Sequence, residues 1–151
     1  MFRGLQVVVS GIALAAFTLA GAAVASAQEP AAAPEKPVLT LEGDANIMIV
    51  LIKPDKTADF EAVIAKYKEA LAKNDKAARK EQLAGFKVYK SPTAMGGNTA
   101  YVFSVDPVVK GEEYDITRVI NEVFPSEALD FFNKYKDAFA GRQIIVLNKL
   151  P

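Results

Sequence analysis

Residues 46–53 read Asn-Ile-Met-Ile-Val-Leu-Ile-Lys, and this stretch decides the fold class. Successive side chains of a β-strand point to opposite faces of a sheet, so residues of one parity share a face. Both parities are apolar here: Ile47, Ile49 and Leu51 lie on one, and Met48, Val50 and Ile52 lie on the other. The pattern predicts a strand that is covered on both faces and that ends at Pro54-Asp55.

Helical patterns separate this strand from the next one. Thr57 is predicted to cap a helix, and a second, polar helical piece is predicted over residues 75–84, with Gly85 as its C-terminal cap. The first helix has apolar residues at helical spacing: Phe60, Val63, Ile64, Tyr67 and Leu71. A half-exposed strand over residues 85–90 is expected to follow.

The second half of the chain repeats this arrangement after a loop over residues 91–98. The predicted elements are a strand over 99–105, a short helix over 115–124, a longer helix from Ser126 to Gly141 and a strand over 142–150. The longer helix is expected to pack through one face: Leu129, Phe132, Tyr135 and Phe139.

The resulting order, β-α-β-β-α-β, is that of the split βαβ, or ferredoxin-like, pattern, which is an α+β fold. It predicts a four-stranded antiparallel sheet with helices on one face and with the first and third strands at the centre. We expect one such domain over residues 46–151.

The N-terminus has the features of a secretory signal peptide. Residues 1–27 contain a basic residue, an apolar run and the small-x-small sequence Ala25-Ser26-Ala27. Cleavage between Ala27 and Gln28 would leave a Pro/Ala-rich linker over residues 28–45. We expect a periplasmic or extracellular product with no membrane attachment after cleavage; an uncleaved membrane anchor is the alternative.

Helices on one face leave the other face of the predicted sheet bare. The strands over residues 99–105 and 142–150 also have apolar residues on both parities. At about 25 cal/mol per Å², leaving such a face in water forfeits roughly 5–10 kcal/mol, which rivals the stability of a small domain. The simplest cover is a second copy of the chain, so we expect a homodimer. A bound apolar ligand and the folded-back linker are the alternatives.

The composition excludes several classes of chemistry. The 151 residues include no Cys, no His and no Trp, and 18 basic residues balance 18 acidic ones. Cysteine nucleophiles and Ser-His-Asp triads are therefore impossible, and zinc, copper and haem sites lose their commonest ligand. Balanced charge provides no field that attracts nucleic acid. We expect no cofactor, no metal and no nucleic-acid partner.

Four residues are the candidates for a ligand-binding site: Tyr89, Tyr101, Phe103 and Arg142. A tyrosine on or near the sheet can donate a hydrogen bond to a ligand carbonyl, although a buried tyrosine more often belongs to the core. Arg142 can hold a carboxylate, and its alternative is a surface or interface ion pair.

Other charged or glycine-rich runs are interpreted as ordinary surface features. Glu112, Glu113 and Asp115 lack the spacing of an EF-hand and are interpreted as a solvated helix start. Gly96-Gly97-Asn98 fits a turn. The basic run is interpreted as a solvated helix face: Lys73, Lys76, Arg79 and Lys80.

Several stretches resemble known groups of proteins. The strand over residues 47–52, Lys53-Pro54 and the helix start at 57–60 resemble the dimeric α/β-barrel superfamily, which includes antibiotic-biosynthesis-type monooxygenases. Residues 105–111 and 121–125 are similar to an uncharacterised group of exported bacterial proteins. The resemblance implies a sheet-mediated dimer. Oxygenase members commonly use Asn, His, Trp or Arg around a pocket, and this chain has neither His nor Trp.

These observations predict an exported, non-enzymatic domain that dimerises through its sheet and binds a small apolar ligand or a protein partner. The alternative is a cofactor-independent enzyme of the α/β-barrel monooxygenase type, with Tyr, Asn or Arg in a pocket. A structural envelope protein without any pocket is a third possibility.

Overall fold

Within residues 36–151, which the computed structural model describes, four strands form one antiparallel sheet in the order β2-β3-β1-β4. The strands are β1 (Ala45–Ile52), β2 (Phe86–Lys90), β3 (Thr99–Val105) and β4 (Phe139–Leu147). β1 and β3 are central, as the sequence predicts. The predicted signal peptide over residues 1–27, with its cleavage site between Ala27 and Gln28, lies outside the described residues.

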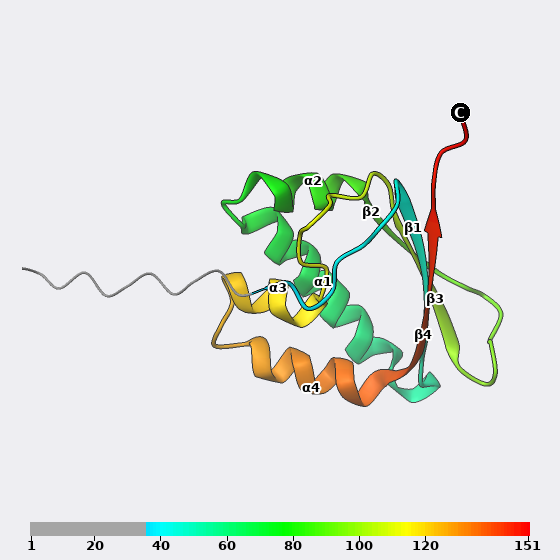
Figure 1. Ribbon diagram of the computed structural model, residues 1–151. Coiled ribbons are helices and arrows are strands. Elements are labelled where there is room, and N and C mark those ends of the chain that lie inside the picture. Colours follow the sequence, from blue (N-terminus) through cyan, green and yellow to red (C-terminus); the bar gives the residue numbers. More distant parts are fainter. Residues whose placement is uncertain (1–35) are drawn as a thin grey trace, which may run out of the picture. The chain divides into compact units, whose positions relative to one another are not determined.

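The helices of the described residues lie on one side of this sheet, and the other side is bare (Figure 1). They are α1 (Thr57–Lys73), α2 (Ala77–Gly85), α3 (Ile116–Val123) and α4 (Ala128–Ala138), with a short 3₁₀ turn η1 (Pro54–Lys56) before α1. The structure is therefore an α+β fold with an open antiparallel sheet.

The register of the sheet separates its two faces. On the helix side, Met48 is opposite Phe103 and Val50 is opposite Tyr101, and all four side chains are buried. On the bare side, Ile49 is opposite Val102 on β3 and Gln143 on β4. The double apolar pattern of residues 46–53 is thus present, but only one of its faces is covered within the described residues.

Aromatic rings form the centre of the core. The ring of Phe60 on α1 lies 4.7 Å from that of Tyr101, 6.2 Å from that of Phe103 and 6.0 Å from that of Tyr135, between centroids. The predicted stripe of α1 is buried, because its residues recur every three or four positions and face the sheet together.

The predicted inward face of the last helix is wrong. Phe131 and Ala138 of α4 are buried, whereas Leu129 is 70% exposed and Phe132 is 45% exposed. This sequence contains two overlapping apolar stripes that share Tyr135, and the stripe with Phe131 and Ala138 packs against the core. α4 also ends at Ala138, before Gly141, because the following residues pair with β1.

The predicted helix caps also need correction. Thr57 is the first residue of α1 and makes no capping bond, and no side chain caps α4, so Ser126 has no capping role. Gly85 is the last residue of α2 and has no left-handed backbone. Glycine is required there for space, since a Cβ atom would lie 3.0 Å from the carbonyl oxygens of Asp106 and Pro107.

The last part of the predicted linker contacts the domain. We call residues 38–41 the strap. The backbone N–H groups of Val38 and Leu39 donate to the carboxylate of Glu113, at 2.7 and 2.9 Å, and Leu41 is buried in the core. Tyr114 N–H donates to the Leu39 carbonyl at 2.8 Å. The folded part of the chain therefore includes residues before 46.

Candidate functional site

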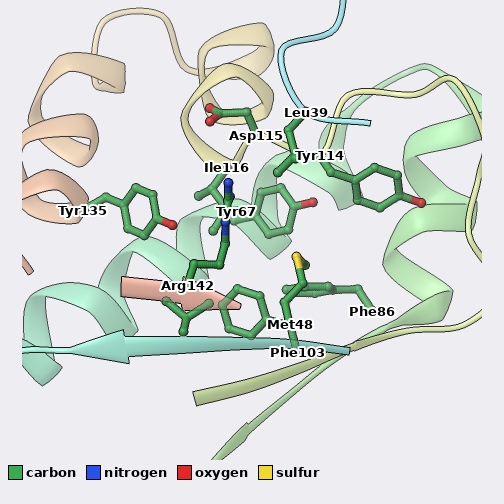
Figure 2. A pocket seen from close by; sticks show the side chains of 11 residues that line it. Leu39, Met48, Tyr67, Phe86, Phe103, Tyr114, Asp115, Ile116, Tyr135 and Arg142 are labelled. Atoms are coloured by element: carbon green, nitrogen blue, oxygen red, sulfur yellow. The ribbon is translucent and has the colours of Figure 1, made fainter. Parts of the chain in front are cut away.

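A recess lies between the helix side of the sheet and the helices (Figure 2). Its volume is about 390 Å³ when its open mouth is included, but its inner space is only about 20 Å³. Space of that inner size holds about one water molecule. The lining residues are Leu39, Met48, Val50, Tyr67, Phe86, Phe103, Tyr114, Asp115, Ile116, Tyr135 and Arg142.

Three polar groups of the recess have no hydrogen-bond partner among residues 36–151: the guanidinium of Arg142 and the hydroxyls of Tyr67 and Tyr135. In Figure 2 the Arg142 guanidinium and the Tyr135 hydroxyl point toward one another, and the Tyr67 ring lies beside them. Tyr67 is only 1% exposed. Its hydroxyl keeps some solvent access, because Asn46 Oδ1 is the one fully buried side-chain polar atom of residues 36–151 without a partner, so a water or a ligand atom can bind the Tyr67 hydroxyl.

The electrostatics of the recess follow from burial. Burial raises the pKa of Tyr67 well above its ordinary value. Burial also raises the pKa of Tyr135, and the positive charge of Arg142 partly offsets that rise. Both tyrosines therefore remain protonated near neutral pH and act as hydrogen-bond donors.

The other polar lining groups already have partners. The Tyr114 hydroxyl accepts a hydrogen bond from Val109 N–H at 2.8 Å. Asp115 Oδ1 accepts from Thr117 N–H at 3.0 Å, Thr117 Oγ1 at 2.6 Å and Arg118 N–H at 3.0 Å, so its carboxylate caps α3. Asp115 Oδ2 makes no hydrogen bond within residues 36–151, so the groups that remain available to a ligand are three donors, Arg142, Tyr67 and Tyr135, and one acceptor, Asp115 Oδ2.

The structure brings two of the four sequence-predicted site residues together. Phe103 and Arg142 both line the recess. Tyr101 is on the same face, but its hydroxyl donates to Glu61 Oε1 at 2.7 Å and does not line the recess. Tyr89 belongs to the opposite face of the sheet and is 57% exposed.

Sequence reasoning missed Tyr67 and Tyr135 as site residues. Both were assigned only to the apolar stripes of their helices, where most of their area does pack. The sequence did contain one indication. Each tyrosine belongs to a helix face that is predicted to pack on the sheet, so two hydroxyl groups that need hydrogen-bond partners are expected near that sheet.

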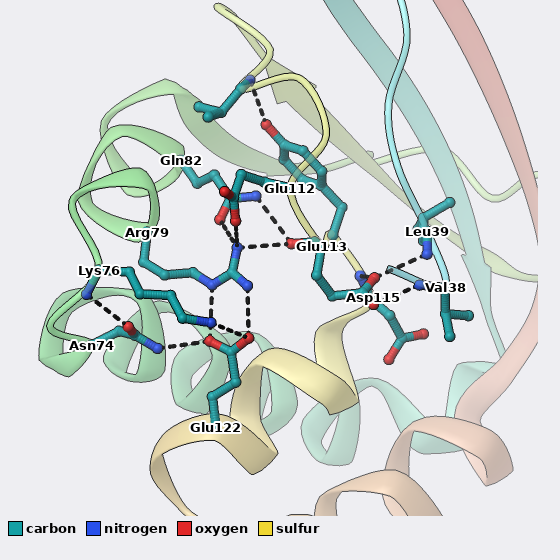
Figure 3. Close-up of polar contacts among 12 residues, drawn as sticks. Val38, Leu39, Asn74, Lys76, Arg79, Gln82, Glu112, Glu113, Asp115 and Glu122 are labelled. Atoms are coloured by element: carbon teal, nitrogen blue, oxygen red, sulfur yellow. Dashed lines mark hydrogen bonds and ion pairs between the residues drawn. The ribbon is translucent and has the colours of Figure 1, made fainter. Parts of the chain in front are cut away.

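A polar cluster, which we call the Arg79 cluster, surrounds a buried cation (Figure 3). The Arg79 guanidinium donates to both carboxylate oxygens of Glu122, to Gln82 Oε1 at 2.7 Å and to Glu112 Oε2 at 3.0 Å. Arg79 is 2% exposed, so its expected place on a solvated helix face is wrong. The cluster joins α2 to α3 and the preceding loop.

The interpretation of the acidic run as a solvated helix start holds for only part of it. Asp115 caps α3, but Glu113 is 6% exposed and its carboxylate accepts three backbone N–H bonds, from Val38, Leu39 and Asp115. Glu112 pairs with Arg79. The three carboxylates have separate partners, and no group of acidic residues within residues 36–151 is arranged to hold a metal ion.

The bare side of the sheet is the second candidate site. We call it the outer face. Tyr89, Ile145 and Leu147 are the most exposed of its apolar residues, at 57%, 39% and 42%. Its apolar residues are Ile47, Ile49, Leu51, Tyr89, Ala100, Val102, Ile145 and Leu147.

Among the described residues, no helix is long and apolar enough to cross a membrane. No protein-family model matches this chain, and no curated protein matches it.

Proposed function

We propose that this chain is an exported, ferredoxin-like binding module that forms a homodimer through its outer face and holds a small amphipathic molecule. Support for the ferredoxin-like assignment comes from the central position of β1 and β3 and from helices on one side only. The observation that carries the dimer is the continuous apolar outer face, which has no cover within residues 36–151.

The size of the outer face suits a small dimer interface. Strands lie about 4.8 Å apart and rise about 3.3 Å per residue, so four strands of about seven residues form a plane of about 19 by 23 Å. This is about 440 Å² before side-chain relief is added. A standard stable interface buries about 800 Å² per partner, so this plane is a lower bound that fits a small interface.

The charge distribution favours a second copy of this chain over a charged partner. In a two-fold interface each patch meets itself, so a charge at its centre would face a like charge. β1, β3 and β4 contribute no charged residue to the outer face. Lys87 is on the peripheral strand β2, opposite Ser104, where it can stay hydrated.

Sedimentation velocity on the purified protein tests this proposal. We expect the mass of two chains for the wild type and the mass of one for Ile49→Lys, because Ile49 is central in the outer face. Leu129→Lys is the matched control, since Leu129 is an exposed leucine on α4, away from the sheet. A monomeric wild type, or an Ile49→Lys variant that remains dimeric, would show that the outer face is not the interface.

A second candidate function is catalysis without a cofactor in the recess. It is favoured by the unpartnered Arg142, Tyr67 and Tyr135, which are polar groups directed into an apolar site. The same groups are sufficient for binding alone. Incubation of the protein with a compound that it binds, followed by mass spectrometry of that compound, distinguishes binding from catalysis. An unchanged mass of the compound supports the binding module, and a changed mass supports the enzyme.

A further inference from the structure

The recess between sheet and helices has a definite chemical preference. Its walls are mostly apolar, and its available polar groups are three hydrogen-bond donors, the Arg142 guanidinium and the hydroxyls of Tyr67 and Tyr135, and one acceptor, Asp115 Oδ2. An apolar pocket with a few convergent polar groups is the usual form of a small-molecule site. We propose that the recess binds a small organic monocarboxylate, with the carboxylate on Arg142 and Tyr135. This inference rests on the proposed binding role but not on the proposed dimer.

The cation in the recess is available to an anion. Arg142 is on the edge strand β4, opposite Val50, which places it on the helix side of the sheet. It makes no hydrogen bond or ion pair within residues 36–151. Guanidinium groups bind carboxylates through two parallel N–H bonds, and the resulting charge-assisted bonds are about twice as strong as neutral ones.

The second donor lies on the facing helix. Figure 2 shows the Tyr135 hydroxyl of α4 pointing toward the Arg142 guanidinium. Because the two donors come from opposite walls, a carboxylate between them would receive bonds on both sides. The Asp115 carboxylate also lines the recess: its Oδ1 accepts three hydrogen bonds at the start of α3, whereas its Oδ2 makes none within residues 36–151. A bound carboxylate must therefore lie on the Arg142 side of the recess, away from Asp115.

Tyr67 adds a third donor to the recess. Its side chain is 1% exposed and its hydroxyl makes no hydrogen bond within residues 36–151, but the hydroxyl keeps some solvent access, since Asn46 Oδ1 is the one fully buried side-chain polar atom of these residues without a partner. The inner space of about 20 Å³ holds one oxygen-sized group. That group is either a water or an oxygen of the ligand, and in both cases it can accept a hydrogen bond from the Tyr67 hydroxyl.

The volume limits the ligand. The inner space excludes a hydrocarbon body, so the body must lie in the open mouth of the recess, next to solvent. Leu39 of the strap and Ile116 of α3 supply apolar surface there. The expected ligands are therefore monocarboxylates with a short apolar or aromatic body.

NMR titration of the purified protein with acetate, butyrate and benzoate tests this inference. Benzamide is the neutral isostere of benzoate, and inorganic phosphate is an anion without an apolar body. We expect benzoate or butyrate to shift the Arg142 Nε–H signal in a saturable way, and benzamide and phosphate to leave it unchanged. No saturable shift with any of the three carboxylates, or an equal shift with benzamide, would overturn the proposal.

Variants locate the bound carboxylate. Arg142→Gln and Tyr135→Phe are each expected to weaken binding about tenfold or more, since each removes a bond to a charged group. Tyr101→Phe is the matched control, because the Tyr101 hydroxyl bonds to Glu61 and does not line the recess. Equal weakening by Tyr101→Phe and Tyr135→Phe would contradict the assigned site.

The outcome is separable from that of the dimer. Sedimentation of the same samples reports self-association without reference to the recess. A monomer that binds benzoate would refute the dimer and support the carboxylate site, and a dimer that binds none of the carboxylates would do the reverse.

Discussion

Arg79 holds Glu122 through two parallel hydrogen bonds, from Nε to Oε2 at 3.0 Å and from Nη2 to Oε1 at 2.7 Å. The two residues are on α2 and α3, so the pair connects helices that are far apart in the sequence. Arg79 is almost fully buried, and Glu122 retains partial exposure. The pair is therefore less costly to desolvate than a fully buried one, and its geometry is bidentate.

The first prediction concerns this pair. Arg79→Met removes the bidentate donor of the Glu122 carboxylate, which keeps bonds from Asn74 and Lys76, and leaves the Glu113 carbonyl with Gln82 as its donor. We expect the free energy of unfolding to fall by about 2–4 kcal/mol, somewhat below the range for fully buried pairs because Glu122 is partly exposed. Urea denaturation measures this loss. Lys80→Met, an exposed change on the same helix, should alter stability by less than about 0.5 kcal/mol, and an equal loss in the two variants would contradict the assigned role.

A pH dependence follows from the same pair. Burial alone would raise the pKa of Glu122, but the hydrogen bonds and charge of Arg79 outweigh burial and hold that pKa below its ordinary value. A lowered folded-state pKa stabilises the fold above the unfolded pKa of about 4.3, and this stability is lost as the pH falls through the folded pKa. We therefore expect Glu122→Gln to lose less stability than the wild type when the pH falls from about 6 to about 3, the range over which the Glu122 carboxylate becomes protonated. Urea denaturation at each pH measures this loss, and the same pH dependence of the unfolding free energy in both proteins would contradict the prediction.

The strap is predicted to depend on one carboxylate. Glu113 accepts the backbone N–H bonds of Val38 and Leu39, so Glu113→Gln replaces one acceptor oxygen by a donor. We expect faster hydrogen exchange at Val38 and Leu39, with β1 and β3 unchanged. Glu112→Gln is the control, because Glu112 bonds to Arg79 and not to the strap. Unchanged exchange at the strap in Glu113→Gln would show that this carboxylate does not hold it.

Gly43 is predicted to be irreplaceable for two separable reasons. Its φ is +75°, and a Cβ atom would lie 2.6 Å from Val146 Cγ1 and 2.7 Å from the Leu147 carbonyl oxygen. Gly43→Ala should therefore cost about 1–2 kcal/mol for the left-handed backbone and about 1–3 kcal/mol for crowding. Gly97→Ala isolates the first cost, since Gly97 has a φ of +77° and open space around it. Thermal or urea unfolding of both variants should show a larger loss for Gly43→Ala, and equal losses would exclude crowding.

Export is predicted from the N-terminal sequence alone. Small residues at positions 25 and 27 suit a signal peptidase, so the secreted product is expected to begin at Gln28. Intact-mass spectrometry of the protein from a secreting host measures this directly. Ala27→Phe should block or displace cleavage, whereas Ala31→Phe, beyond the site, should not. A product that retains residues 1–27 would support the membrane-anchor alternative.

Most of the fold was predictable because its signals are local. The strand over residues 99–105 coincides with β3, and the predicted first strand is displaced by only one residue from β1. The inward face of α4 was not predictable, because Leu129 and Phe131 both belong to apolar stripes of one helix. Which stripe is buried depends on how α4 crosses the sheet and on the early start of β4, and neither is encoded in the helix itself.

The candidate site was predictable only in part. Phe103 and Arg142 occupy strand positions whose side chains face the helices, so the alternation along each strand could place them in the recess. Tyr67 and Tyr135 are on helices far apart in the chain, and packing alone brings both to the recess that Arg142 lines, with the Tyr135 hydroxyl pointing toward Arg142. The burial of Arg79 could not be predicted from the basic residues around it. Its partners Glu112, Glu113 and Glu122 are more than thirty positions away in the sequence.

By itself, the sequence determined the elements, their order and the apolar character of both sheet faces, because strand parity and helical spacing depend on neighbouring residues. It also excluded cysteine and histidine chemistry by composition. Only the tertiary structure decided which sheet face the helices cover, which donors meet in the recess and which charge is buried, because these depend on contacts between residues distant in the chain.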